Sequence, residues 1–596
     1  MRILSTTDLH GYIDVKDTPG GLSRMASVLH ELRGRHENCL IFDNGDFLQG
    51  APICDLAAMG AFGTSENPVL QTMNAIGYDA VGLGNHEFDY GLDYLRAALP
   101  QADFPVLCSN VEINESPWQR DLFLRKQMID DDGQPHELKI GVFSVVPPHI
   151  QDWCRVHLEG KAKVQGFHSA ASARIQALKN QGADLVIALC HAGDKPYGIG
   201  GNGEALASEI ASIEGLDAII CGHTHMVSPP VGHTAHLHRT LRHTGVSTVP
   251  RILPGHCGRF VGCLELTLAK GDNGWAWVRS RIRNHAVTEQ TPKKRAVEQV
   301  ARPWINRCNV ALRMPVGHAE TVLSSHFATI TCDAPTRLAA MAKLQAGKRL
   351  VANTAFADLP MVAAANPFLI GQDGPGGYVS VPAGEITLAH LFEIYPYLNG
   401  IDAFQMTGGQ IYDWLEASAS AFHQITPGEA DQLLWNPKFA PYELDSILGL
   451  TYEIDLTRPA LFQPNRQLVE TGGHGRIRNL RLDGKPLHES QPLVLITNSY
   501  RGGGGGAYPH ATKDNRIPVP FVDVRLELQD LLSQGVTSAS LPDSPWRFSA
   551  VAGTSVQFET GPKAKNHLPN TLHKQLKRLE INEKGFATYR LSLETP

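Results

Sequence analysis

The sequence predicts an α/β protein with more than one domain, and two observations indicate this. The chain has 596 residues, which is too long for a single hydrophobic core. Short β-rich runs alternate with helical stretches up to about residue 285, a pattern typical of layered α/β folds. We therefore expect a first α/β domain over residues 1–285, with further structure after it.

The first domain is expected to contain eight strands and at least two long helices. The strand-like runs are "RILSTT", "CLIFDNGD", "DAVGLGN", "FPVLCSN", "LKIGVFSVV", "DLVIALC", "DAIICG" and "GCLELTLA". Each is a short apolar run bounded by turn residues, as buried strands are. The stretches "GLSRMASVLHELRGR" and "SAASARIQALKNQGA" have the helical spacing of apolar residues.

A connector and a second α/β domain are expected in the remainder of the chain. The polar helical segment "QTPKKRAVEQVARPWINRCNVALR" predicts a connector over residues 286–314. Helical stretches such as "TLAHLFEIYPYL" and "GQIYDWLEASASAF" then occur among strand-like runs such as "LGLTYEID" and "PLVLITNSY". We therefore expect a second domain over residues 315–596, in which the tract "RGGGGG" at 501–506 is too short to be a linker.

Composition excludes two classes of partner. The chain is 42% hydrophobic and 19% charged, with a formal net charge of -7. A chain with this net negative charge lacks the excess of basic residues that binding of a nucleic-acid polymer requires. The longest apolar runs are far shorter than the roughly 20 residues that span a bilayer, so no membrane segment is predicted.

The amino terminus and the cysteines favour a cytoplasmic protein. "MRILSTTDLHG" enters a strand pattern directly, without the charged and apolar regions of a secretory signal. The ten cysteines lie between Cys39 and Cys332 without paired spacing. The alternative is a periplasmic or secreted chain from which a signal peptide has been removed.

Polar residues follow five of the predicted strands at the point where each strand ends. They are Asp8 and His10, Asp46, Asn85 and His86, His191, and His223 and His225. In a largely parallel sheet the carboxyl ends of the strands share one edge, so these side chains can converge. The pattern therefore predicts one site built from five separate loops.

Each of these motifs also has an ordinary interpretation. A single histidine after a strand is commonly a turn residue, and Asp-Asn-Gly-Asp is an ordinary turn sequence. Five unrelated turns, however, are not expected to carry metal-ligand residue types after five different strands. Nitrogen and oxygen donors without a thiolate suit Zn, Mn, Fe or Co. Their number exceeds the need of one tetrahedral ion, which favours two ions that share a bridging carboxylate.

The motifs also carry a resemblance to a known family. In order, "DLHG", "DNGD", "GNHEFDYG", "HAG" and "GHTH" resemble the calcineurin-like metallophosphoesterases, specifically their 5'-nucleotidase branch. "LFEIYPYLNG", "TGGQIYDWLE", "TNSYRGGGGGAYP" and "GFATYRLSL" resemble the bacterial bifunctional 2',3'-cyclic-nucleotide 2'-phosphodiesterase/3'-nucleotidases. The resemblance implies a four-layer α/β/β/α metallophosphoesterase domain, followed by a C-terminal α/β substrate-binding domain of the 5'-nucleotidase type.

The resemblance implies a role for each residue of the metal motifs. One divalent ion is assigned to Asp8, His10, Asp46 and His225, and a second to Asp46, Asn85, His191 and His223. His86 is similar to the catalytic histidine of the family, and Asp89 to the acid that orients it. The spacing agrees, because Asp89 follows His86 by three residues and can accept a hydrogen bond from its ring. Glu87 is expected to be structural.

The resemblance also implies a substrate and a place for its base. The expected reaction is metal-assisted hydrolysis of 2',3'-cyclic nucleotides to 3'-nucleotides and then to nucleoside and phosphate. The base is expected to lie between Tyr397 and Tyr500 and to be contacted by Asn399. Tyr395 is the alternative to Tyr397. The glycine tract at 502–506 permits close backbone approach to the ligand or is simply a flexible loop. Some relatives carry Asp where this chain has Gly506, which puts a ribose contact there in doubt.

Several alternatives stay open at the level of sequence. A 5'-nucleotidase or a nucleotide-sugar hydrolase would use the same metal motifs, and a non-catalytic nucleotide-binding protein would keep the same fold. The complete set of ligands, together with His86 and Asp89, favours an enzyme. The native metal, the base preference and the oligomeric state are not determined by these motifs.

Overall fold

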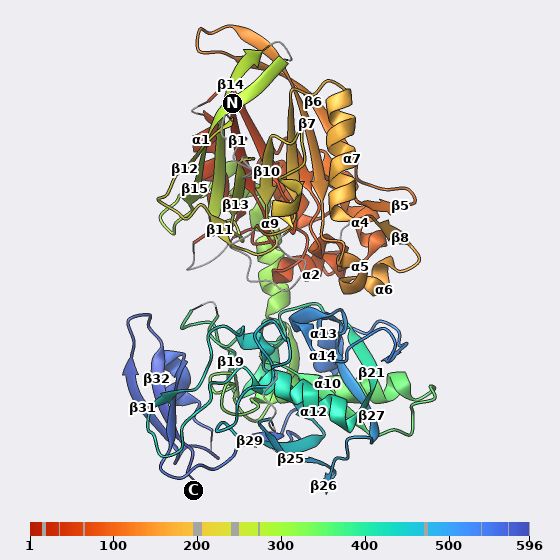
Figure 1. Cartoon of the computed structure of the whole chain (residues 1–596), viewed down its shortest axis with the longest axis vertical. Helices are drawn as coiled ribbons and strands as arrows, with labels where there is room; N and C mark the ends of the chain where they lie inside the picture. The colour runs from red at the N-terminus through yellow and green to blue at the C-terminus, as the bar shows by residue number, and fades with distance from the viewer. Residues whose placement is uncertain are drawn as a thin grey trace. The chain divides into compact units, whose positions relative to one another are not determined.

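The computed structural model divides into two compact units, Met1–Ala311 and Leu312–Pro596, each described here by itself (Figure 1). The structure describes residues 1–14, 19–34, 36–63, 66–194, 206–239, 249–271, 274–372, 374–469, 475–537, 539–569 and 571–594. Within these ranges no helix is both long enough and apolar enough to cross a membrane.

The first unit contains two large sheets. One has the order β12 (Ala235–His238), β15 (Gly274–Ala286), β14 (Phe260–Gly271), β1 (Arg2–Thr6), β2 (Cys39–Asp43), β3 (Ala80–Gly82) and β4 (Val106–Leu107). The other has the order β11 (Val227–Ser228), β13 (Arg251–Pro254), β10 (Ala218–Cys221), β9 (Leu185–Cys190), β7 (Pro135–Val145) and β6 (Asp121–Ile129). Strands β1 to β4 are parallel in the first sheet, and β7, β9, β10 and β13 are parallel in the second.

Alternating side chains of the central strands build a core on each face of the second sheet. Leu185, Ile187 and Leu189 of β9 share an apolar cluster with Ile3 of β1, so this face packs against the first sheet. Val186 and Ala188 belong to the cluster that contains helix α7 (Phe167–Asn180). A strand that is buried on both faces needs apolar residues at successive positions, which explains the continuous run "LVIALC".

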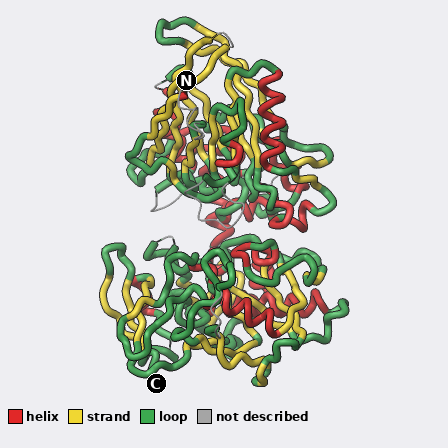
Figure 2. Tube along the Cα trace, in the orientation of Figure 1, coloured by secondary structure: helices red, strands yellow, loops and turns green. Residues whose placement is uncertain are grey.

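Helices cover the outer faces of both sheets (Figure 2). Helix α1 (Leu22–Gly34) contacts β1 and β14, while α7 contacts β7 and β9. The order is therefore helix, sheet, sheet, helix, as predicted. The remaining described elements of this unit are α2 (Pro52–Ala58), α3 (Pro68–Asn74), η1 (His86–Phe88), α4 (Leu92–Ala98), η2 (Leu99–Gln101), β5 (Val111–Ile113), α5 (Ile150–Trp153), α6 (Arg155–Leu158), β8 (Ala162–Val164) and α8 (Ala207–Ile210).

Helix α9 (Arg295–Leu312) lies where the polar connector was predicted. Strand β15 ends at Ala286, next to the predicted end of the first domain at residue 285. The helix reaches the boundary between the two units, and its buried residues are Val297, Ala301, Trp304 and Cys308.

The second unit is built around a mixed sheet with helices on both faces. Its order is β23 (Ser446–Leu448), β18 (Met361–Ala365), β27 (Pro492–Asn498), β21 (Ile401–Thr407) and β28 (Arg516–Ile517). Leu493 and Leu495 of β27 cluster with α12 (Gly408–Ala419), while Val494 and Ile496 cluster with α10 (Ala334–Val351). The period of two along β27 thus places one helix on each face.

Smaller sheets complete the second unit. Two are four-stranded: β22 (Gln432–Leu433), β30 (Ser555–Thr560), β32 (Ala587–Ser592) and β31 (Leu576–Ile581); and β26 (Lys485–Pro486), β25 (Ile477–Leu482), β24 (Leu450–Ile454) and β29 (Trp546–Phe548). Two are two-stranded: β16 (Pro315–Ala319) with β20 (Gly384–Thr387), and β17 (Leu323–Ser324) with β19 (Ser380–Val381). The other helices are α11 (Leu388–Ile394), η4 (Pro441–Glu443), α13 (Ser499–Gly502), η5 (Gly505–Ala507), α14 (Val524–Ser533) and η6 (Pro562–Asn566).

Candidate metal centre

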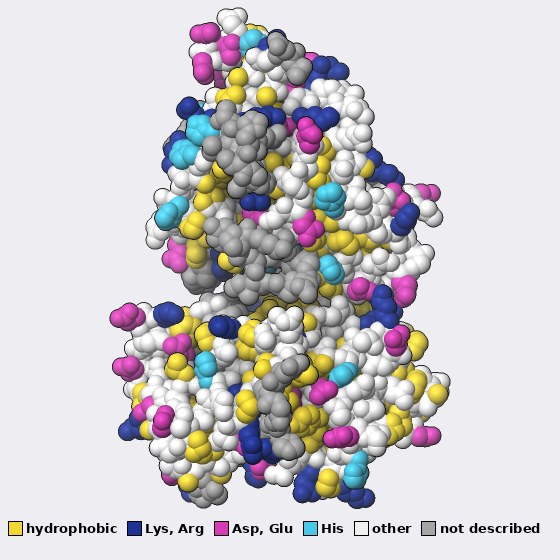
Figure 3. All heavy atoms as spheres, viewed as in Figure 1, with side chains coloured by type: hydrophobic (Ala, Val, Ile, Leu, Met, Phe, Trp, Pro, Cys, Tyr) yellow, Lys and Arg dark blue, Asp and Glu magenta, His cyan; other side chains and the backbone are white. Residues whose placement is uncertain are grey.

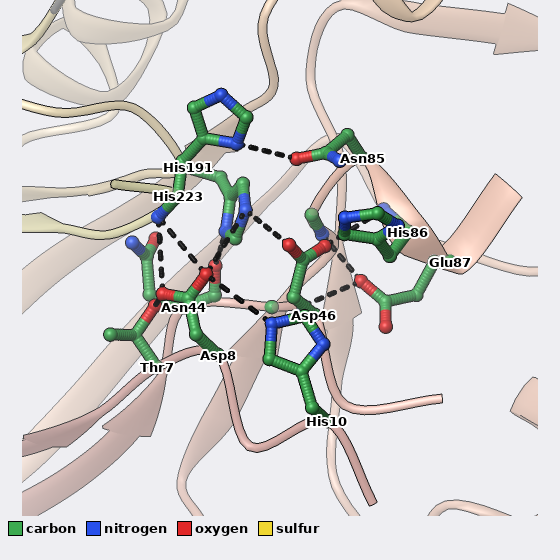
Figure 4. Close-up of polar contacts among 12 residues, drawn as sticks. Thr7, Asp8, His10, Asn44, Asp46, Asn85, His86, Glu87, His191 and His223 are labelled. Atoms are coloured by element: carbon green, nitrogen blue, oxygen red, sulfur yellow. Dashed lines mark hydrogen bonds and ion pairs between the residues drawn. The ribbon is translucent and has the colours of Figure 1, made fainter. Parts of the chain in front are cut away.

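The five predicted loops meet in the first unit, but their strands belong to two sheets. β1, β2 and β3 of one sheet and β9 and β10 of the other each end at one of the loops. The interpretation that all five share the edge of one parallel sheet is therefore too simple. Because the two sheets pack face to face, their carboxyl ends lie together and the side chains converge (Figure 4).

Five of the predicted ligands have a left-handed backbone. They are Asp8, His10, Asp46, His223 and His225, with φ between 48° and 68°. Such angles cost free energy for a residue with a Cβ, and they persist only where the surrounding structure holds them. Strained backbone of this kind concentrates at functional sites. The left-handed conformation of these five residues sets the direction in which their side chains leave the loops.

Asp8, His10 and His225 form the first group of ligand atoms, all within 4.8 Å of one another. The Nε2 atoms of His10 and His225 are 3.0 Å apart. Asp8 Oδ1 lies 3.5 Å from His225 Nε2 and 4.0 Å from His10 Nε2. Two imidazole nitrogens and a carboxylate oxygen thus point at one position.

Asp46, His191 and His223 form the second group, also within 4.8 Å. His191 Nε2 lies 2.9 Å from Asp46 Oδ2 and 3.8 Å from Asp8 Oδ1. The amide oxygen of Asn85 lies 2.8 Å from His223 Nδ1, which brings it to the same group. Asp8 is thus close to ligand atoms of both groups.

Two observations test whether these residues fit divalent ions. Asp46 Oδ2 and His191 Nε2 are buried and face each other at 2.9 Å, and neither has a further hydrogen-bond partner among the described residues. In addition, His10 and His191 each donate a hydrogen bond from Nδ1 to a backbone carbonyl, that of Gln49 at 3.0 Å and that of Asn44 at 2.7 Å. These bonds fix the tautomer that leaves Nε2 as a ligand. The donor set therefore fits divalent ions.

The pKa shifts favour the ligating forms of most of these groups. Burial lowers the pKa of His10 and of His223 to about 3, which keeps both rings neutral. Burial raises the pKa of Asp46, but nearby histidines, His191 first, outweigh it and leave the pKa well below its usual value. Burial lowers the pKa of His191, but Asp46 and Asp8 outweigh it and raise that pKa to about 10. A cation between these carboxylates would replace that proton.

His86 and Asp89 lie beside the two groups and form a pair. His86 Nδ1 donates a hydrogen bond to Asp89 Oδ2 at 2.7 Å, and the side chain of His86 remains 35% exposed. Burial lowers the pKa of His86, but Asp89 and then Asp46 outweigh it and raise that pKa to about 9. The backbone N–H of His86 donates to Asp46 Oδ1 at 2.8 Å. Among the described residues Nε2 of this ring has no hydrogen-bond partner, so it can meet an incoming group.

Glu87 shapes the loop that carries Asp46. Its buried carboxylate accepts hydrogen bonds from four backbone N–H groups, those of Asp46, Phe47, Leu48 and Gly84, at 2.6 to 2.9 Å. A side chain that satisfies four backbone donors has a structural function, as predicted for Glu87.

The three residues predicted to bind the base lie in the second unit. Tyr397 is 47% exposed and Tyr500 is 42% exposed, whereas Asn399 is buried. Their segments are hydrogen-bonded to each other, because Ser499 N–H donates to Gly400 O at 2.8 Å and Gly400 N–H donates to Ser499 Oγ at 3.0 Å. Tyr395 is fully buried, so it is not open to a ligand.

The glycine tract after Tyr500 is held in place by arginines. Arg501 donates to Gly505 O at 3.2 Å, Arg466 donates to Gly506 O at 3.1 Å, and Arg516 donates to Gly502 O. A Cβ at Gly505 would lie 2.5 Å from the ring of Tyr500. The tract is therefore a packed turn against Tyr500, not a flexible loop.

Three residues of the site were missed by the sequence analysis. Trp153 stacks on His223, His256 stacks on His225, and the Cys154 thiol donates to Asp89 Oδ1 at 3.4 Å. His256 follows strand β13, so the rule that found the other histidines could have found it. Trp153 and Cys154 lie at the end of a four-residue helix, and no local pattern marks them.

Comparison with known proteins identifies both halves of the chain. Residues 1–227 match the calcineurin-like phosphoesterase family, whose members use divalent metals, and residues 315–513 match the 5'-nucleotidase C-terminal domain. The chain is 30% identical to the 2',3'-cyclic-nucleotide 2'-phosphodiesterase/3'-nucleotidase of Haemophilus influenzae, covering 100% of this chain and 95% of that protein. It is 31% identical to the trifunctional nucleotide phosphoesterase protein YfkN of Bacillus subtilis, covering 100% of this chain and 42% of that longer protein.

Solved structures of 5'-nucleotidases have the same fold. A putative 5'-nucleotidase from Staphylococcus aureus, in complex with alpha-ketoglutarate, has a TM-score of 0.70 at 20% identity, covering 92% of this chain and 99% of that chain. A 5'-nucleotidase precursor from Thermus thermophilus has a TM-score of 0.58 at 17% identity, covering the same shares. The predicted fold class and family are confirmed: the chain belongs to the calcineurin-like phosphoesterases with a 5'-nucleotidase C-terminal domain, a family of metallophosphoesterases.

Proposed function

We propose that the chain hydrolyses 2',3'-cyclic nucleotides to 3'-nucleotides, and then these to nucleoside and phosphate, at a pair of divalent ions. The observation that carries the proposal is the meeting of two groups of ligand atoms beside the His86–Asp89 pair. The substrate follows from the names of relatives such as the Haemophilus influenzae enzyme and from the motifs of the second unit.

Seven side chains would hold the ions. Asp8, His10 and His225 would hold one, and Asn85, His191 and His223 the other, with Asp46 bridging them. When bound, two such ions lower the pKa of a water molecule and neutralise charge on a phosphoryl group. His191 Nε2 lies 2.9 Å from Asp46 Oδ2, and Asp46 Oδ1 is already fixed by the N–H of His86. This set of nitrogen and oxygen donors suits Mn, Zn, Co or Fe.

His86 would act on the substrate, not on an ion. Its Nδ1–H is bonded to Asp89, so the exposed edge of the ring presents Nε2. A protonated Nε2 can donate to a phosphoryl oxygen or give its proton to the leaving oxygen. Asp89 would hold the ring in the required orientation and stabilise its charged form.

The second unit would select nucleotides. Tyr397 and Tyr500 are exposed on two segments that are hydrogen-bonded to each other, and the buried Asn399 precedes Gly400 in the first of them. Exposed aromatic rings of this kind stack on bases. A small-molecule nucleotide is therefore the proposed ligand.

Product analysis tests this proposal. The purified chain, supplied with Mn²⁺ or Co²⁺, would be assayed on 2',3'-cyclic AMP, 3'-AMP, 5'-AMP and UDP-glucose, with nucleoside and phosphate identified. We expect the cyclic and 3'-nucleotides to give the highest kcat/KM. A preference for 5'-AMP or UDP-glucose would instead show a 5'-nucleotidase or nucleotide-sugar hydrolase. Binding without turnover by metal-loaded protein would show a non-catalytic nucleotide-binding protein.

An Asp46→Asn variant tests the metal centre, and Asp79→Asn is its matched control. Loss of the bridging charge should lower metal content at both positions and abolish turnover. Asp79→Asn changes a carboxylate of the same unit that bonds Ile41 N–H and Lys126, and it should keep both ions. Elemental analysis of both proteins decides: two ions per chain in an active Asp46→Asn protein would refute the bridging role.

A further inference from the structure

The two ligand groups contain four histidines, and their rings are oriented in two different ways. His10 and His191 each donate from Nδ1 to a backbone carbonyl, so a hydrogen bond fixes each ring. For His223 and His225 the described residues provide no such bond from a ring to a backbone carbonyl. Both sit on one short loop after β10, two residues apart, and both have a left-handed backbone. The ring nitrogens of these two histidines instead face other proposed ligand atoms, Asn85 Oδ1 at 2.8 Å from His223 Nδ1 and His10 Nε2 at 3.0 Å from His225 Nε2. All of these atoms would face an ion when it binds, so contacts with the faces of the rings would have to orient His223 and His225.

Trp153 covers the ring of His223. The two rings are stacked, with centroids 5.5 Å apart and planes 18° apart. Trp153 also stacks with His149, with centroids 5.6 Å apart and planes 24° apart. Helix α5 is anchored by the fully buried Ile150, and the Cys154 thiol donates to Asn85 O at 3.8 Å. The indole is thus held against His223 from a segment tied to the Asn85 loop.

His256 covers the ring of His225. Their centroids are 4.6 Å apart and their planes 15° apart. The loop that carries His256 is fixed on both sides by backbone hydrogen bonds: Gly255 N–H donates to Met226 O at 3.1 Å, and Cys257 N–H donates to Asp8 O at 2.8 Å. This loop is therefore tied both to the chain just after His225 and to the ligand Asp8.

We propose that Trp153 and His256 are positioning residues that hold His223 and His225 in the ligating orientation by stacking. Stacked rings in this distance range attract each other and restrict rotation of the ligand ring about its Cβ–Cγ bond. They would do for these two histidines what carbonyl hydrogen bonds do for His10 and His191. The inference rests on the proposed metal centre and adds one orienting ring to each ion.

Metal titration of single variants tests the inference. Trp153→Ala and His256→Ala would be titrated with Mn²⁺ in the full chain, against a competing chelator. Loss of groups that orient ligands typically weakens metal binding about 10- to 100-fold. We expect each variant to lose about 10-fold or more in the affinity for one ion, with the other ion less affected. The absorption bands of bound Co²⁺ should change for the same ion.

Conservative variants separate stacking from general packing. Trp153→Phe and His256→Phe keep a flat ring and should retain most of the affinity. Trp275→Ala and His136→Ala remove an aromatic pair of the same unit that stacks on no ligand, and they should bind both ions normally. If folded Phe variants bind as weakly as the Ala variants, or if the Ala variants bind both ions like the parent, the inference is wrong.

The two proposals fail in different ways. A parent chain that binds fewer than two ions contradicts the dinuclear centre, whatever the variants do. A parent chain that binds two ions, with Trp153→Ala and His256→Ala unchanged, contradicts only the positioning role.

Discussion

The ring of His86 is held by Asp89 and is partly exposed, and this determines what its replacement should do. Nδ1 donates to Asp89 Oδ2 at 2.7 Å, the ring has an edge contact with His10, and the side chain is 35% exposed. His86→Asn should keep both ions and lower kcat by roughly 10²- to 10⁴-fold, the range for positioned acid–base groups. Single-turnover kinetics with elemental analysis of the same protein is the measurement. Loss of the ions in this variant would mean that His86 is a ligand.

His326 of the second unit should make folding depend on pH. Burial, then the neighbouring His567 and Lys563, lower the pKa of His326 from 6.5 to about 4. Its ring stacks on Tyr378 and His567, and Nδ1 lies 2.8 Å from Ser324 Oγ. Below pH 6.5 the unfolded chain binds a proton that the folded chain does not bind. The free energy of unfolding should therefore fall between pH 6.5 and 4, by up to about 3 kcal/mol.

A variant that keeps the ring tests this pH dependence. His326→Phe retains an aromatic ring but cannot titrate, so its unfolding free energy should fall less between pH 6.5 and 4. Urea unfolding followed across that range is the measurement. Equal slopes for the parent and His326→Phe would assign the acid sensitivity to other groups.

At the scale of elements, the α13 turn that carries Tyr500 is held in place by the buried side chain of Arg501. Arg501 donates to Asp445 Oδ1 at 2.8 Å, to Tyr442 O at 2.7 Å and to Gly505 O at 3.2 Å. Removing one partner of a buried ion pair costs about 3 to 5 kcal/mol. Arg501→Met should destabilise the second unit by that amount in urea unfolding.

The exposed pair of Arg547 and Glu453 is the matched control. It lies in the same unit at 2.6 Å, with the Arg547 side chain 79% exposed. Exposed pairs contribute about 0 to 1 kcal/mol, so Arg547→Met should have a small effect. Similar losses in both variants would contradict the view that burial makes the Arg501 pair important.

The segment with Tyr397 and the α13 turn with Tyr500 should act as one base-binding element. Stacking on an aromatic ring contributes about 1 to 3 kcal/mol per base, and about 1.4 kcal/mol is tenfold. Tyr397→Ala and Tyr500→Ala should each lower kcat/KM for 2',3'-cyclic nucleotides by roughly 5- to 150-fold. Hydrolysis of an aryl phosphate ester, which has no base, should change little.

Tyr395→Phe is the control for these tyrosines. The ring of Tyr395 is fully buried and packs against Phe368 with centroids 4.7 Å apart, so Phe keeps the packing. The change removes only a hydroxyl that accepts from Asn498 Nδ2 at 3.5 Å, so it should affect both substrates less than either alanine variant does. If Tyr397→Ala and Tyr500→Ala impair the aryl ester as much as the nucleotide, these tyrosines support the fold and the base binds elsewhere.

At the scale of the whole molecule, the ions should stabilise one unit and not the other. All the ligand-type residues of the two groups lie within Met1–Ala311. Ligand binding at 100 times Kd contributes about 2.7 kcal/mol to stability. A chelator should therefore reduce hydrogen-exchange protection in peptides of the first unit, and added Mn²⁺ should restore it. Equal loss of protection in Leu312–Pro596 would contradict this expectation.

The sequence by itself determined the α/β class, eight of the fifteen described strands of the first unit and the polar residues that follow five of them. This succeeded because a buried strand is a local pattern, a short apolar run. Asp8, Asp46, Asn85, His191 and His223 each lie one to three residues after the end of such a strand. The resemblance of the motifs added the family, which the comparisons confirm.

Only the tertiary structure decided which sheets carry the site and what surrounds its ligands. His10 and His225 are 215 residues apart along the chain, yet their Nε2 atoms lie 3.0 Å apart. Their meeting depends on how two sheets pack, which no local pattern encodes. The stacking of Trp153 and His256, and the burial of Tyr395 beside the exposed Tyr397, likewise depend on distant neighbours. Local sequence fixes where a side chain leaves its strand, whereas packing fixes what that side chain meets.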